Sequence, residues 1–150
     1  MKRASLILLY CCFGILITYS QSVEIECEGL LHGSFETYEE GLKIGTFFRK
    51  GDIQIEKYFK DSTFSLARIR SKECVFYINS YEIKRQIDTI TWIVKYQKIS
   101  DTKYSYLIEP AFLDNGISFK GHTIKISDSI DNEAFIIFES LEGNIPKSDF

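Results

Sequence analysis

Hydrophobic and polar residues alternate along most of the chain beyond its first twenty residues. The clearest alternation spans residues 89–98. One side of that segment carries Ile90, Trp92, Val94 and Tyr96. A period of two residues is typical of a β-strand with one face toward water. Abundant Tyr, Phe and Ile beside only two Pro and one Met also favour sheet over helix.

Similar segments recur at intervals of about ten residues, with short polar turns between them. The expected strands cover residues 33–38, 43–49, 53–58, 64–70, 74–81, 89–98, 103–109, 117–126 and 134–139. Residues 23–32 are expected to form a first strand or a lead-in, and 82–88 a polar interlude with room for one helical turn. This spacing predicts an all-β fold, an antiparallel up-and-down meander of roughly eight or nine strands in a small barrel or sandwich.

Residues 64–70 interrupt the simple alternation. Phe64 and Leu66 share one side of the expected strand, yet Arg68 and Arg70 continue that same side. Either a β-bulge reverses the two faces, or two arginines point inward. We expect the bulge, because an inward charge requires a partner.

The chain begins with positive charge at Lys2 and Arg3, followed by an apolar run over 6–17 that is short for a membrane span. Small residues precede the next polar stretch, which predicts a secretory signal peptide over 1–20. Cleavage would leave a single exported β domain over 21–150. That domain is expected to be secreted or periplasmic, without membrane attachment after cleavage.

Two alternatives to cleavage remain open. The apolar segment could stay as a membrane anchor, since anchors and signal peptides look alike. Lipidation at Cys11 or Cys12 is the other alternative, although Tyr10 stands where a lipoprotein signal has a small residue.

Charge argues against one class of partner. The eighteen basic residues become sixteen without Lys2 and Arg3, against twenty-one acidic residues, so the mature chain has a formal net charge of −5. Nucleic-acid binding usually depends on a basic surface that neutralises phosphates. We therefore expect no nucleic-acid partner.

Cys27 and Cys74 are the cysteines left after cleavage. In an oxidising compartment two such thiols tend to pair. A bridge between them would close a loop of roughly fifty residues, worth about 4 kcal/mol in the chain-entropy model. The alternative is two separately buried thiols.

The central stretch resembles a group of small exported β proteins of Bacteroidetes-type bacteria. The motifs that carry the resemblance are Gly33-Ser-Phe35, Arg49, Gln54-Ile-Glu56, Phe64-Ser-Leu66 and Glu73-Cys74. The resemblance covers about residues 27–78 and implies a fold but no established activity. Some members of the group carry the label DNA topoisomerase IV, which conflicts with a short, acidic, exported chain that lacks an ATP-binding signature.

Candidate metal ligands are scattered. His32 and His122 could join the two cysteines around zinc, but structural zinc sites bring ligands in closely spaced pairs. Asp128, Asp131 and Glu133 lack the spacing that wraps calcium. We expect neither a metal nor another cofactor.

Catalytic signatures are equally weak. Asp52 with Glu56, or Glu39 with Glu40, could be posed as a glycosidase pair, but carboxylates are common on an acidic surface. The sequence has no Gly-x-Ser-x-Gly and no glycine-rich phosphate loop. No catalytic residue is therefore assigned.

Aromatic residues gather on neighbouring expected strands. The candidate ligand-binding residues are Trp92, Tyr96, Tyr104, Tyr106 and Phe119. Ordinary core packing would also account for them. A cavity lined by these rings would favour an apolar small-molecule ligand, whereas a filled interior with an exposed aromatic patch would favour a protein or glycan partner.

The sequence thus favours a non-catalytic binding or interaction module. Its specific version is a lipocalin-like carrier of an apolar molecule. The alternative is a small secreted hydrolase whose site is assembled from residues far apart in the chain.

Overall fold

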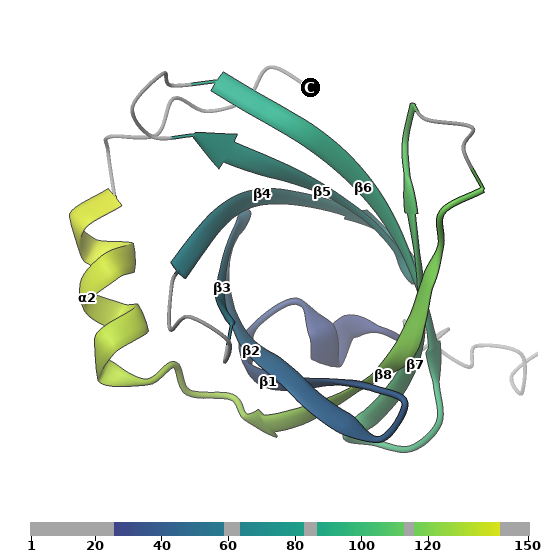
Figure 1. Cartoon of the computed structure of the whole chain (residues 1–150). Coiled ribbons are helices and arrows are strands. Elements are labelled where there is room, and N and C mark those ends of the chain that lie inside the picture. Colours follow the sequence, from purple (N-terminus) through teal and green to yellow (C-terminus); the bar gives the residue numbers. More distant parts are fainter. Residues whose placement is uncertain (1–25, 59–63, 83–86, 113–115, 142–150) are drawn as a thin grey trace, which may run out of the picture.

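Eight antiparallel strands form a closed barrel in the computed structural model, which describes residues 26–58, 64–82, 87–112 and 116–141 (Figure 1). The strands are β1 (Gly33–Glu39), β2 (Leu42–Lys50), β3 (Ile53–Tyr58), β4 (Phe64–Lys72), β5 (Val75–Glu82), β6 (Ile87–Lys98), β7 (Lys103–Pro110) and β8 (Phe119–Ser127). Each strand pairs with the next, and β1 also pairs with β8. The predicted all-β meander is confirmed, and of the two architectures the barrel is the correct one.

Tight turns join the strands where the sequence supplies residues that accept a positive φ. Glu40 and Gly41, between β1 and β2, have φ values of 49° and 82°. Gly51, between β2 and β3, has a φ of 64°. Such values match the twist of antiparallel hairpins, so these short connections keep neighbouring strands adjacent.

Alternation along the strands produces two separate hydrophobic clusters. The inner cluster fills part of the barrel and includes Phe35, Phe47, Phe76 and Val94. The outer cluster lies between the barrel wall and helix α2 (Asn132–Leu141). Its buried members are Phe48, Ile55, Leu66, Tyr81, Ala134 and Phe138. Figure 1 shows α2 outside the barrel, beside β3 and β4.

The prediction of a last strand over 134–139 is wrong, because this segment is most of α2. A short apolar run does not by itself distinguish a strand from a helix. Asp131 favours the helix here, because its Oδ1 accepts a hydrogen bond from the Ala134 amide at 2.8 Å and so caps the helix N-terminus. Ala134 and Phe138 then fall on one face, four residues apart, and both are buried against the barrel.

The expected bulge in residues 64–70 is also absent. The β4 register against β3 and β5 runs without a shift. Arg68 lies on the outer face together with Leu66, while Ala67 and Ile69 pack inside the barrel. Neither alternative was correct, since the arginines do not point inward and Leu66 faces outward under α2.

Other local expectations have mixed outcomes. The lead-in over 23–32 contains a 3-10 helix, η1 (Glu28–Leu30), and residues 23–25 lie outside the described residues. Glu82 and 87–88 belong to strands, whereas 83–86, where a helical turn was expected, also lie outside the description. The predicted signal peptide is likewise outside it.

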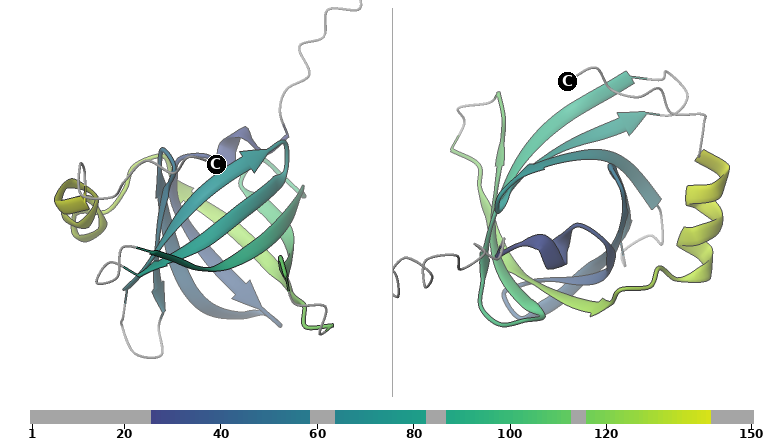
Figure 2. Two further views of the ribbon diagram at one scale, coloured as in Figure 1. Left: turned by 90° about the horizontal axis from the view of Figure 1, so that it is seen from above. Right: turned by 180° about the vertical axis from the view of Figure 1, so that it is seen from behind.

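Helix η1 lies across one end of the barrel (Figure 2). Leu30 has no exposed surface and belongs to the inner cluster. The predicted disulfide is present: Cys27, just before η1, is bonded to Cys74 in the β4–β5 turn, with a Cα–Cα distance of 5.3 Å. The Cys74 carbonyl also accepts a hydrogen bond from the Tyr96 amide at 2.8 Å. The bridge therefore fastens the closing segment to the rim of the barrel.

Removing the bridge should destabilise the fold. The Cys27→Ala, Cys74→Ala double variant should lose about 4 kcal/mol of unfolding free energy, because the unfolded chain regains the entropy of the open loop. Urea unfolding followed by circular dichroism measures this. Wild type in reducing agent is the matched control and should lose a similar amount. A loss below about 1 kcal/mol in both would contradict the stabilising role.

Candidate functional site

A cavity of about 320 Å³ occupies the end of the barrel opposite η1. Its mouth is bordered by residues at strand ends, including Glu39, Tyr58 and Phe119. Tyr58 and Phe119 retain 44% and 42% of their surface exposed. The barrel is therefore closed by η1 at one end, and its cavity opens to solvent at the other end.

Aromatic and aliphatic side chains form the deeper wall. Phe47, Val94, Tyr96 and Tyr106 line the cavity and are buried. The Tyr96 and Tyr106 rings meet edge to face, with centroids 6.4 Å apart. Such packed rings leave a fixed surface on which an apolar molecule can rest.

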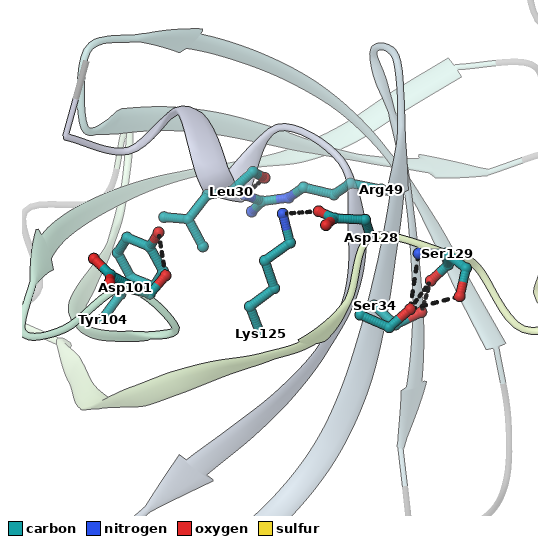
Figure 3. A network of polar contacts seen from close by, with 9 residues as sticks. Leu30, Ser34, Arg49, Asp101, Tyr104, Lys125, Asp128 and Ser129 are labelled. Carbon is teal, nitrogen blue, oxygen red and sulfur yellow. Dashed lines mark hydrogen bonds and ion pairs between the residues drawn. The ribbon is translucent and has the colours of Figure 1, made fainter. Parts of the chain in front are cut away.

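Arg49 lies beneath this wall and has no exposed surface. Its Nε donates to Gln54 Oε1 at 2.7 Å, and its Nη1 donates to the Leu30 carbonyl at 2.9 Å (Figure 3). Its Nη2 donates to the Tyr96 hydroxyl at 3.3 Å. The guanidinium carbon is also 4.3 Å from the centre of the Phe76 ring. These contacts join the closing helix to the wall of the cavity.

The charge of Arg49 is offset through an intermediary. Burial lowers the pKa of Arg49, while Tyr96 and, less strongly, Glu56 raise it. Gln54 accepts from Arg49 and donates from its Nε2 to Glu56 Oε1 at 2.5 Å. Glu56 thus compensates the buried cation without touching it, and its carboxylate lies at the cavity surface.

Glu39 is the second carboxylate in the cavity wall. The Tyr106 hydroxyl donates to Glu39 Oε1 at 3.3 Å and lies equally far from the Tyr38 carbonyl. Burial and the Glu39 charge raise the pKa of Tyr106 well above its ordinary value of 10.0. A side chain on Gly121 would overlap the Tyr106 hydroxyl, so glycine is required for this approach.

One buried hydroxyl in the wall is unsatisfied. Thr123 is 1% exposed, and its Oγ1 has no hydrogen-bond partner among the described residues. Thr123 pairs with Thr37 of β1 and Tyr104 of β7, and it lines the cavity. A buried polar atom without a partner is costly, and a bound molecule could satisfy it.

Most of the predicted ligand-binding residues lie together. Trp92, Tyr96, Tyr106 and Phe119 line the cavity, and the Trp92 and Phe119 rings meet 6.3 Å apart. Tyr104 does not join them. It is buried at the η1 end, where its hydroxyl lies 3.5 Å from the Asp101 carbonyl (Figure 3).

The polar residues of the cavity were not predicted. Gln54 and Glu56 alternate with Ile53 and Ile55 along β3. The face that carries the isoleucines is covered by α2, so Gln54 and Glu56 point into the barrel. A sequence signal did exist. Glu56 is on the opposite side of β3 from Ile55, which lies under α2, and Glu39 is on the same side of β1 as the buried Phe35.

The candidate metal and catalytic groups are dispersed. The disulfide uses both cysteine sulfurs, and no metal-binding group of His, Cys, Asp or Glu occurs within the described part of the chain. Asp128 forms an ion pair with Lys125 at 2.5 Å (Figure 3), Asp131 caps α2, and Glu133 pairs with Lys57 at 2.7 Å. The three carboxylates thus have separate roles.

Comparison with known proteins adds no relative: no family model, no curated protein and no solved structure matches this chain. Across the described ranges, none of the helices has the length and hydrophobicity needed to traverse a bilayer. The resemblance to exported bacterial β proteins remains an expectation.

Replacing Arg49 tests the network beneath the cavity. Arg49→Lys should lower the unfolding free energy by roughly 2–4 kcal/mol, because an ammonium cannot reach three acceptors in the guanidinium geometry. Arg70→Lys, on the exposed outer face, is the matched control and should change it by less than about 1 kcal/mol. Urea titration measures both. Equal effects would contradict a special role for Arg49.

Alkaline pH should reveal the raised pKa of Tyr106. Above pH 10 the unfolded state ionises this tyrosine while the folded state keeps it protonated, so stability falls as pH rises. Tyr106→Phe should therefore lose less stability than wild type between pH 9 and 11. Urea unfolding at both pH values measures the difference, and parallel curves would contradict it. The same comparison between pH 7 and 9 is the control and should show no divergence.

Proposed function

We propose that this protein is a non-catalytic carrier that binds a small, largely apolar molecule inside its barrel. The observation that carries the proposal is the 320 Å³ cavity, open at one end and lined by aromatic and aliphatic side chains. Natural ligand sites are concave, mostly apolar and supplied with a few placed polar groups. Glu39, Glu56 and Thr123 are such groups here.

The architecture supports the same proposal. A small closed barrel has room for one ligand when its side chains do not fill it. Here η1 and the inner cluster fill one end only. The lipocalin-like form of the proposal rests on this combination of meander barrel, closed base and outer helix.

Export is part of the proposal. The disulfide between Cys27 and Cys74 is the kind of bond that persists in oxidising compartments. The apolar leader predicted over 1–20 supports the same destination, secreted or periplasmic.

The alternative of a small secreted hydrolase has less support. His122 stacks on Tyr38 with ring centroids 4.8 Å apart, and neither His122 nor His32 lines the cavity. The posed carboxylate pairs are also separated, because Glu39 and Glu56 line the cavity whereas Glu40 and Asp52 do not. Protein or glycan partners at the exposed rings remain a further prediction.

A neutral fluorescent dye tests the carrier. 1-Aminonaphthalene, an uncharged two-ring dye that is small enough for the cavity, should bind saturably with a Kd of about 1–100 μM, within the range of modest apolar ligands. Trp92, the only tryptophan of the chain, lines the cavity and should transfer energy to the bound dye. Ile108→Phe fills the cavity and should weaken binding at least tenfold. Leu107→Phe, its outward-facing neighbour, is the control; no saturable signal in wild type would contradict the proposal.

A further inference from the structure

We propose that the molecule held in the cavity is an organic cation, namely a small amine with an apolar or aromatic body. This inference rests on the proposed carrier function and names its ligand class. It follows from the carboxylates and aromatic rings that line the cavity, and from the positive groups of Lys57 and Arg49, which do not point into it.

The charges at the cavity surface are negative. Glu39 and Glu56 both line it. The Glu56 oxygens already accept from Gln54, Tyr58 and Ser65, so Glu39 is the carboxylate that would meet the ligand cation. The one basic lining residue among those described is Lys57, whose Nζ turns to the outer face and pairs with Glu133 at 2.7 Å. A ligand that enters therefore meets carboxylates, and a cation is the charge complement.

Aromatic rings provide a second source of attraction for a cation. Trp92, Phe119, Tyr58 and Tyr106 surround the same space. The Trp92 and Phe119 rings lie at an interplanar angle of 68°, so they form a corner rather than a flat stack. The faces of such rings attract cations, most strongly for tryptophan, and they also bury the apolar body of the molecule.

Thr123 supplies an acceptor for an ammonium proton. Its buried Oγ1 has no partner among the described residues, and a hydroxyl oxygen offers lone pairs to an N–H donor. This observation is independent of the carboxylates. A hydroxyl can also donate, so Thr123 calls for a polar group on the ligand, and the carboxylates decide that this group is a cation.

Arg49 does not reverse this preference. Its guanidinium is not part of the cavity lining, and Gln54 and Tyr96 stand between it and the space. Three acceptors already engage its nitrogens. An anionic head group would have to displace one of them, whereas a cation at Glu39 leaves the network intact.

The volume of the cavity limits the size of the ligand. At about 30 Å³ for each water-sized group, 320 Å³ accommodates on the order of ten non-hydrogen atoms. A single ring with a short amine chain meets that limit. A long-chain fatty acid exceeds it.

A matched ligand series tests the inference with the full mature protein. The three probes are 4-phenylbutylamine, 4-phenylbutan-1-ol and 4-phenylbutyrate, which share one apolar body and carry positive, zero and negative charge. Isothermal calorimetry at pH 7 and Trp92 fluorescence measure binding. The amine should bind at least about tenfold more tightly than the alcohol, and the acid more weakly than either.

Variants assign the preference to the carboxylates. Glu39→Gln keeps an acceptor for the Tyr106 hydroxyl and removes the charge, so affinity for the amine should fall about tenfold while affinity for the alcohol changes less than about threefold. Glu109→Gln is the matched control, because Glu109 pairs with Lys95 on the outer face at 2.7 Å. That variant should bind all three probes as wild type does.

The outcomes separate the two proposals. Tight binding of the amine that depends on Glu39 supports the cation. Equal or tighter binding of the alcohol or the acid overturns the cation and leaves the carrier standing, as does saturable binding of the neutral dye without binding of the amine. Failure of the dye and all three probes overturns both proposals.

Discussion

The buried guanidinium of Arg49 is the interaction on which the rest of the barrel depends. A cation without solvent contact costs several kcal/mol unless hydrogen bonds and nearby charge offset it. Here the compensation comes from three separate parts of the chain: the Leu30 carbonyl, Gln54 and Tyr96. Because each partner must be in place, the arrangement couples the closing helix, β3 and β6. The base of the barrel is thereby fixed as one unit.

This arrangement also sets where the empty space lies. The guanidinium and the rings around it fill the η1 end, and Leu30 seals that end without exposed surface. Above it, Gln54 hydrogen-bonds both Arg49 and Glu56, and the Glu56 carboxylate that offsets the buried charge lies in the cavity wall. A need of the fold, the neutralisation of a buried charge, therefore leaves a negative group facing the ligand space. Stability and the chemistry of the site share the same residues.

Helix α2 explains why the barrel wall can be polar inside. It covers Phe48, Ile55 and Leu66 on the outer face of β2, β3 and β4. In β3 the apolar side faces outward, so its inward positions are free to carry Gln54 and Glu56, whereas β2 and β4 also place Phe47, Ala67 and Ile69 inside the barrel. Among the described residues, the outer cluster under α2 contains none from β6. The apolar side of β6 faces into the barrel. The cavity wall is consequently apolar on one side and polar on the other.

The sequence by itself determined the strand order, the hairpin turns and the meander, because period-two alternation and turn residues are local signals. It also brought Trp92, Tyr96, Tyr106 and Phe119 to one face, since neighbouring strands of a meander pair in register. It could not determine which face of a strand is inside once a helix covers the other. Only the tertiary structure decided that, when α2 packed against the wall and Arg49 found its acceptors. Burial is a property of the whole arrangement, whereas alternation belongs to a single strand.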